Sequence, residues 1–152
     1  MAASGVPAGT DTLPKIFLAS VKRGGDRTAH IYYKDGRWVE GTWKEFGDAV
    51  DAVARGLIEL GVEPKRTVNI LSASRREWVI CDQAILATGA ITVPIYPSNL
   101  PDQVEYIINN CEAQFIILEN ADQLAKVRAS STSIRKIVII DGPGDGKEDI
   151  IT

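Results

Sequence analysis

The fold of this chain is decided by the stretch SRREWVICDQAILATGAITVPIYPSNLPDQVEYIINNCEAQFIILEN, residues 74–120. It contains two helix–strand units, one after the other. The first unit begins at a predicted capping box, in which Ser74 is followed three residues later by Glu77. Its helix is expected to end at Gly89, where a left-handed cap is needed, and an apolar strand follows at 90–95.

The second unit repeats this order, with a helix predicted at 102–111 and a strand at 114–118. Outside the two units, apolar strands are predicted at 67–71 and 136–140, with a helix at 120–128. The strand runs are continuously apolar rather than alternating, which is typical of strands covered on both faces. The sequence therefore predicts an α/β fold, with a mainly parallel sheet covered by helices on both faces.

A short helix and a β-hairpin are predicted ahead of this sheet. Apolar residues at three- and four-residue steps indicate a docking helix at 13–21. Strand candidates at 29–34 and 37–41 flank the dipeptide Asp35-Gly36, which favours a tight hairpin turn. This hairpin is the one antiparallel element that we expect.

The longest predicted helix follows the hairpin. Thr42 and Glu45 have the spacing of a capping box, and apolar residues recur at helical steps as far as Leu60. Gly61 then supplies the residue that a left-handed C-cap favours. This segment is expected to form an amphipathic helix that packs one face against the sheet.

The composition is that of a globular protein of one domain. The chain has 152 residues, of which 45% are hydrophobic and 24% charged, and its net charge is −3. The scattered basic residues give no support for a nucleic-acid partner. No apolar run has the length of a transmembrane segment, and the cysteines Cys81 and Cys111 form no disulfide framework. We therefore expect a cytoplasmic location.

The N-terminus lacks both the basic start and the apolar run of a secretory signal. Residues 1–12 are interpreted as a disordered leader, and residues 13–152 as one folded unit. The chain shows no internal repeat.

Several motifs have residue types that could carry chemistry, but their patterns favour structural roles. The loop GPGDGK at 142–147 has Asp141 where a Walker loop needs its first glycine, so we interpret it as a surface turn. His30 has no recognisable triad partner, and a single histidine cannot make a zinc site. Cys81 and Cys111 have apolar neighbours, which indicates packing. We predict no catalytic residue and no metal site.

Arg75 and Arg76 leave two interpretations open. They lie at a predicted helix N-terminus just past the end of a strand, where α/β sheets place ligands and where guanidinium groups suit a phosphate. The simpler interpretation is an ion pair with Glu77 or Glu105, since such pairs explain most charged clusters of this kind.

Three segments in the same order carry a resemblance to a known family. They are TWKEFGDAVDAVARGLIELGV (42–62), TVNILSASRREW (67–78) and GAITVPIYPSNLPDQVEYIINNCEAQFIILE (89–119). Together they resemble the opening of the adenylate-forming superfamily of AMP-forming acyl-CoA synthetases. The Arg-Glu-Trp at 76–78 and the Val-Pro-Ile-Tyr-Pro at 93–97 look most like long-chain fatty acid–CoA ligases.

The resemblance implies an activity for a longer parent enzyme. Such enzymes use ATP and magnesium to convert a carboxylate into an acyl-adenylate, and coenzyme A then takes the acyl group. The family's Ser/Thr/Gly-rich phosphate loop ending in Pro-Lys-Gly, its adenine motifs and its C-terminal lysine have no matching positions here. The resemblance therefore implies a truncated N-terminal subdomain at 13–152, which binds no cofactor alone and whose partner is the remainder of the parent.

The same resemblance implies where ligands would approach. Strand-end loops of this subdomain border the coenzyme A and dimer-facing surfaces in the family, so Tyr96, Ser98 and Arg75 are the candidate ligand neighbours. We also expect the isolated chain to associate with itself through exposed strand edges and apolar surface. The alternative functions are a stand-alone, non-catalytic interaction or regulatory module derived from the family, and a small nucleotide-binding α/β protein.

Overall fold

A computed structural model describes residues 11–147 and 150–151, so the predicted leader lies almost wholly outside the described residues. In chain order the elements are α1 (Leu13–Gly24), β1 (Thr28–Lys34), β2 (Arg37–Thr42), α2 (Trp43–Glu59), β3 (Thr67–Leu71), α3 (Arg76–Ala87), β4 (Ile91–Ile95), α4 (Pro101–Asn110), β5 (Phe115–Leu118), α5 (Ala121–Arg128), β6 (Lys136–Ile139) and β7 (Ile150–Ile151). The predicted order of helices and strands is confirmed, and the short strand β7 adds an element to it.

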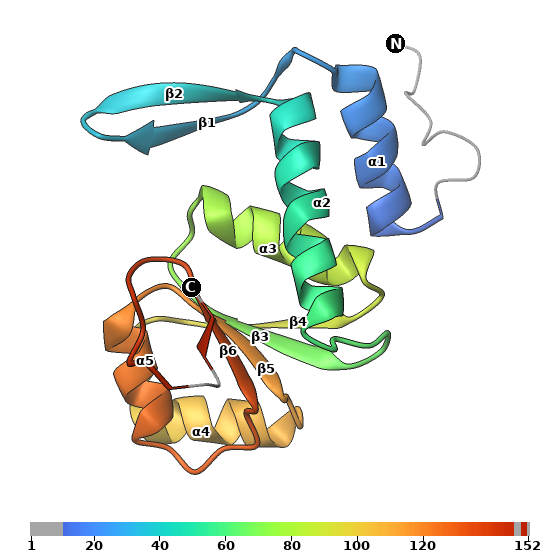
Figure 1. Ribbon diagram of the computed structural model, residues 1–152. Helices are drawn as coiled ribbons and strands as arrows, with labels where there is room; N and C mark the ends of the chain where they lie inside the picture. The colour runs from blue at the N-terminus through green and yellow to red at the C-terminus, as the bar shows by residue number, and fades with distance from the viewer. Residues whose placement is uncertain (1–10, 148–149, 152) are drawn as a thin grey trace.

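The main sheet is parallel throughout its described part. Its strand order is β4-β3-β5-β6-β7, and each neighbouring pair runs in the same direction. The helices lie on both sides of it, with α2 and α3 on one face and α4 and α5 on the other (Figure 1). The predicted α/β architecture is therefore confirmed, because each crossover helix covers a face of the sheet.

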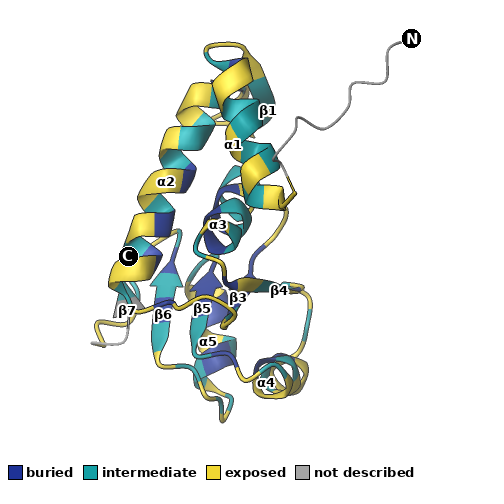
Figure 2. Cartoon of the chain, turned by 90° about the vertical axis from the view of Figure 1, so that its right-hand side faces the viewer, coloured by how far each residue is buried: buried dark blue, intermediate teal, exposed yellow. Residues whose placement is uncertain are grey.

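Alternate side chains of the strands supply two separate cores. Val68, Ile70 and Ile117 pack with α2 and α3, whereas Leu71 and Leu118 pack with α4 and α5. Figure 2 shows the buried residues gathered on the sheet and on the helix sides that face it, while the outer side of α2 is exposed. Burial on both faces explains why the strand sequences do not alternate.

The predicted hairpin and the capping box at its end are both confirmed. β1 and β2 are antiparallel, and Lys34 pairs with Arg37 across a turn in which Asp35 and Gly36 both have positive φ. At the end of β2, the Thr42 hydroxyl accepts the Glu45 amide at 3.1 Å, and the Glu45 carboxylate accepts the Thr42 amide at 2.9 Å. One residue thus ends the hairpin and caps α2.

The second predicted capping box is wrong. The N-cap of α3 is Arg75 rather than Ser74, and it makes no side-chain cap hydrogen bond. Glu77, which was expected to reach back to the backbone, instead accepts a hydrogen bond from Arg75 Nε at 2.6 Å. The Glu77 carboxylate therefore pairs with the Arg75 side chain and does not cap the helix.

Candidate functional site

A cleft lies between the β1–β2 hairpin and the N-terminal end of α3, and we call it the hairpin cleft. Its volume is about 880 Å³. The lining residues come from β1, α2, the start of α3 and the end of β6: His30, Ile31, Tyr32, Tyr33, Lys34, Phe46, Ser74, Arg75, Arg76, Glu77, Val79, Ile140 and Asp141. Since α3 follows β3, the cleft borders the carboxyl ends of the strands, where α/β sheets place ligands.

Arg75 is held by carboxylates from two elements. Besides Glu77, the Asp141 carboxylate at the end of β6 accepts hydrogen bonds from Arg75 Nη1 and, at 3.3 Å, from Nη2. The bond to Asp141 is the main reason why the pKa of Arg75 is raised above its usual value. Burial opposes the charged form of Glu77, but its bond with Arg75 brings the pKa of Glu77 below its ordinary value.

These contacts decide between the two interpretations of Arg75. An ion pair with Glu77 was expected and is confirmed. Glu105, the other expected partner, instead accepts a hydrogen bond from the Ser131 amide at 3.0 Å. Arg75 already pairs with two carboxylates, so a phosphate would have to displace them. The Arg75 side chain therefore links α3 to the end of β6 and does not form an open anion site.

Arg76 and His30 close the inner wall of the cleft. Arg76 Nε donates a hydrogen bond to His30 Nε2 at 3.0 Å, and the Arg76 guanidinium lies 5.3 Å from the centre of the Tyr32 ring. The imidazole also makes an edge contact with Phe46, with ring centroids 5.2 Å apart. Burial, and then the charge of Arg76, lower the pKa of His30. His30 thus takes part in packing and in one hydrogen bond at the border of the candidate site.

The crevice between β3 and β5 is filled by the chain itself. The order of strands reverses here, since β4 lies on one side of β3 and β5 on the other. The Glu119 carboxylate at the end of β5 accepts a hydrogen bond from the Ala73 amide at 2.7 Å and one from the Ser72 hydroxyl at 3.3 Å. The backbone donor that would attract an anion after β3 is therefore used by an internal carboxylate.

The structure does not bring the three candidate ligand neighbours together. Arg75 lines the hairpin cleft, whereas Tyr96 and Ser98 do not. Tyr96 follows the edge strand β4 with 78% of its surface exposed, and the carbonyl of Pro97 accepts a hydrogen bond from Lys126 of α5. The ligand roles suggested for these residues stay predictions.

Sequence reasoning missed the residues that complete the cleft. His30 comes from β1, 46 residues before its partner Arg76 of α3, and Tyr32 comes from the same strand, whereas Asp141 comes from beyond β6. The sequence could have indicated part of this group, because side chains alternate along a strand and His30 and Tyr32 therefore lie on one face of β1. No local pattern indicates that this face meets Arg76.

The other motifs have the structural roles expected of them. The loop at 142–147 forms turns, and its Asp145 pairs with Arg128 of α5 at 2.9 Å. Cys81 is buried, and burial raises the pKa of its thiol to about 11, which disfavours the nucleophilic thiolate. Cys111 packs beside Asn69. Within residues 11–147 and 150–151, no three metal-ligating side chains come together.

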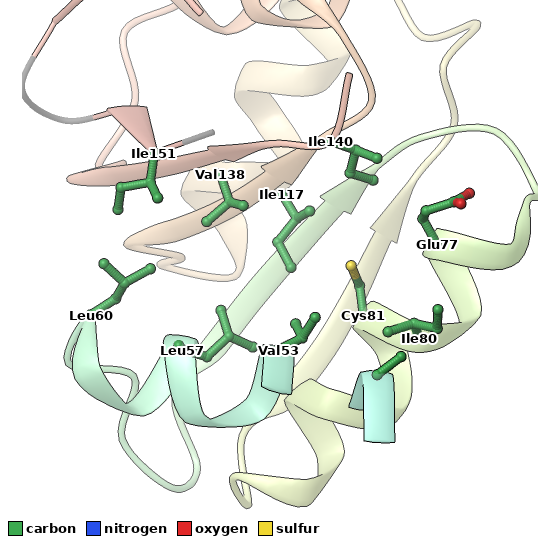
Figure 3. Close-up of a pocket in the computed structure, with 12 residues that line it drawn as sticks. Val53, Leu57, Leu60, Glu77, Ile80, Cys81, Ile117, Val138, Ile140 and Ile151 are labelled. Atoms are coloured by element: carbon green, nitrogen blue, oxygen red, sulfur yellow. The ribbon is translucent and has the colours of Figure 1, made fainter. Parts of the chain in front are cut away.

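An apolar groove lies on the α2–α3 face of the sheet and adjoins the hairpin cleft at Glu77 and Ile140; we call it the α2–β7 groove. Figure 3 shows Leu57 of α2, Leu60 directly after it, Ile80 of α3 and the strand residues Ile117 and Ile151 pointing into it. Its volume is about 340 Å³, and Glu77 is the charged residue at its border. β6 and β7 are therefore less covered on this face than β3 and β5.

Among the described residues, none of the helices has the length and apolar content required to cross a bilayer.

The chain is similar to AMP-binding enzymes and to long-chain-fatty-acid–CoA ligases. The family profile described as AMP-binding enzyme matches residues 17–152. A long-chain-fatty-acid–CoA ligase of Mycobacterium bovis, FadD15, is 39% identical over 121 residues, which cover 78% of this chain and 20% of that ligase. The ligase ACSBG2 of Xenopus laevis is 32% identical over 116 residues, 76% of this chain and 16% of that protein. The chain thus spans about a fifth of the length of these ligases.

Solved structures show the same fold. An anthranilate CoA ligase, AuaEII, in complex with anthranoyl-AMP has a TM-score of 0.73 and 26% identity, covering 84% of this chain and 24% of that enzyme. A putative long-chain-fatty-acid CoA ligase from Rhodopseudomonas palustris has a TM-score of 0.74 at 24% identity, covering 91% and 34%. The second likeness, at this identity, concerns the fold alone.

Proposed function

Because this chain belongs to the AMP-binding enzyme family, we propose that it is the N-terminal subdomain of an ATP-dependent fatty acid–CoA ligase and is not catalytic by itself. The observation that carries the proposal is the match over residues 17–152 combined with coverage of about a fifth of the ligases it resembles. In the parent enzyme, the fatty acid carboxylate attacks ATP to give an acyl-adenylate and pyrophosphate. The thiol of coenzyme A then takes the acyl group and AMP leaves.

The described residues do not fit a magnesium ion, which this chemistry requires. Magnesium needs clustered oxygen ligands, and the described part of the chain brings no such group together. The carboxylates nearest the hairpin cleft, Glu77 and Asp141, are both bound to Arg75. We therefore assign no step of the reaction to a residue of this chain, and propose that ATP, magnesium and coenzyme A are bound with residues of the remainder of the parent.

Fatty-acid-dependent exchange of pyrophosphate into ATP tests the lack of catalysis. We expect the 152-residue chain to give no exchange above a sample without protein. Exchange that requires a long-chain fatty acid would overturn the proposal that the chain is inactive alone. A cytoplasmic location is proposed with it, and fractionation of cells that express the parent would test that location.

A chimera tests the family role separately. Residues 17–152 would replace the matching segment of the Mycobacterium bovis ligase, with which this chain shares 39% identity. We expect the chimera to retain fatty-acid-dependent exchange, because the two-sided core that positions the strand ends is preserved. A folded chimera without exchange would favour the alternative of a non-catalytic interaction module.

We further propose that the isolated chain associates with a second copy of itself through the α2–β7 groove. The groove is mainly apolar, and among the described residues its outer strand β7 pairs with β6 at Ile150 and Ile151. In the parent, further residues of the large lobe would cover this surface. An uncovered apolar groove beside a free strand edge favours self-association.

Light scattering after gel filtration measures this association. Leu60→Glu would place a charge in the groove, and we expect it to shift the chain toward a monomer. Ile58→Glu is the matched control, since Ile58 is on the same helix with 58% exposure and does not line the groove. A wild-type chain that remains monomeric at high concentration, or equal effects of both variants, would contradict the proposal.

A further inference from the structure

The β1–β2 hairpin meets the body of the protein through a small set of contacts. At its base, Trp43 and Lys44 donate backbone hydrogen bonds to the carbonyls of Arg27 and Gly25. Further along β1, the described hydrogen bond between the hairpin and α3 is the one from Arg76 Nε to His30 Nε2. The Arg76–Tyr32 contact adds a cation–π attraction beside it. The side chains of His30 and Tyr32 thus attach β1 to Arg76 of α3, close to the base of the hairpin.

This bond requires a neutral imidazole. A guanidinium only donates hydrogen bonds, so Nε2 of His30 must carry a lone pair, and the proton of the neutral ring is assigned to Nδ1. Nδ1 is buried and has no hydrogen-bond partner among the described residues. A second proton would put an N–H and a positive charge on Nε2, facing an N–H and a positive charge of Arg76 at 3.0 Å.

Three neighbours restrict the ring of His30 on the sides away from Arg76. A Cβ atom placed on Gly41 of the paired strand would lie 2.5 Å from His30 Nε2, which shows that the imidazole lies directly against the Gly41 backbone. Phe46 of α2 and Tyr32 of β1 contact the ring as well. Because these neighbours restrict the ring, we expect repulsion from Arg76 to be relieved by movement of β1.

We propose that His30 is a pH-sensitive latch, whose neutral imidazole docks the hairpin on α3 and whose protonation releases the hairpin and opens the hairpin cleft. Residues 30–34 form one wall of that cleft, so release of β1 changes the space beside Arg75 and Arg76. The latch does not depend on the proposed ligase function.

The charges around His30 set the direction of the pH dependence. Burial and Arg76 of α3 lower its pKa in the docked state, while Glu45 of α2 acts in the opposite sense, and Tyr32 contacts the ring from its own strand. In a released hairpin the pKa returns to about 6.5. Docking is therefore strongest above about pH 6.5 and weakens as the pH falls toward the docked-state pKa.

Amide hydrogen exchange of residues 28–42 at pH 7.5 and pH 5.0, corrected for the intrinsic exchange rate, measures the release. In the wild-type chain we expect protection to fall by up to about tenfold for each unit by which the docked pKa lies below 6.5. His30→Gln keeps an acceptor for Arg76 and does not titrate, so its hairpin should keep its protection at both pH values. Amides of β3 and β5 serve as the internal reference.

The proton resonances of the imidazole give a second and independent test, because His30 is the single histidine of the chain. We expect an apparent pKa below 6.5 in the wild type and a higher value in Arg76→Gln. An apparent pKa at or above 6.5 in the wild type would overturn the latch, and so would an equal loss of protection in the wild type and in His30→Gln. If the hairpin of His30→Gln is already unprotected at pH 7.5, the apparent pKa of His30 in the wild type decides whether the latch stands.

Discussion

In the parallel sheet, every residue of β3 and β5 except the first is buried, whereas the two strands of the hairpin contain one buried residue, Gly41. The sheet is stabilised by aliphatic side chains on both faces, and such burial contributes about 1.5–3 kcal/mol for each large side chain. The hairpin depends on a few directional contacts, among them those of His30 and Thr42. Substitutions in the sheet should therefore change stability mainly by altering the packed volume of the core. Substitutions in the hairpin should change it by removing single contacts.

The largest effect is expected at the centre of the sheet. Ile70 has no exposed surface, so Ile70→Ala should lower the free energy of unfolding by about 2–5 kcal/mol, because it leaves a cavity. Urea denaturation followed by circular dichroism measures this loss. Ile31→Ala on the hairpin is the matched control; Ile31 is 58% exposed, and its change should stay within about 0.5 kcal/mol. Similar losses of unfolding free energy for both variants would contradict the proposed difference between the sheet and the hairpin.

A smaller and local effect is expected from Gly41→Ala. The added methyl group would lie 2.5 Å from the His30 ring, so either the imidazole must move away from Arg76 or the strands must separate. We expect this to lower the free energy of unfolding by about 1–3 kcal/mol. Hydrogen exchange should become faster in residues 28–42 and stay unchanged in β3. Gly56→Ala is the control, since the added methyl group meets no atom within 4 Å beyond its chain neighbours and the adjacent backbone of α2, and alanine favours the helix. Unchanged exchange in the hairpin would argue against a tight contact there.

Thr42 tests the joint between the two regions. Thr42→Ala removes the hydroxyl that caps α2 and should cost about 1 kcal/mol of unfolding free energy. Thr42→Ser keeps an oxygen at the same place and should recover most of the loss. The urea midpoint of the three proteins measures this. A serine variant as unstable as the alanine variant would show that the methyl group of Thr42, rather than its cap, matters.

The smallest effect is expected from the ion pair that joins α3 to β6. Asp141 is 55% exposed, and pairs in such positions contribute about 0.2–1 kcal/mol. Arg75→Gln and Asp141→Asn should therefore each destabilise slightly, and the double variant should lose less than the sum of the two. Raised salt should weaken the wild-type contribution. Additive losses would show that the two side chains act independently.

The same contrast explains what the sequence could predict. The strand runs around Ile70 and Ile117 are local patterns, and local apolar runs were enough to predict a parallel sheet with helices on both faces. The Asp35-Gly36 turn and the Thr42 capping box are also local, and both were predicted correctly. The short strand β7 was not placed, since two residues give no period to recognise.

The hairpin cleft could not be predicted in the same way. Its contacts join residues far apart in the chain, such as Arg75 with Asp141 and Arg76 with His30. The Ser74–Glu77 spacing even suggested a cap, which the structure replaces with an arginine–carboxylate pair. A polar side chain can satisfy its hydrogen bonds with many partners, so spacing alone does not determine which partner it takes.

The position of β3 inside the sheet has a consequence for synthesis on the ribosome. β3 is the first strand of the sheet to be synthesised. One of its two edges stays unpaired until β5 is made, and β5 begins at Phe115, 44 residues after Leu71. At roughly 5–20 residues per second, that edge stays open for about 2–9 s of translation. An apolar strand with an open edge is a template for wrong pairing, so chaperone capture of nascent chains should be highest while residues 72–114 are being made.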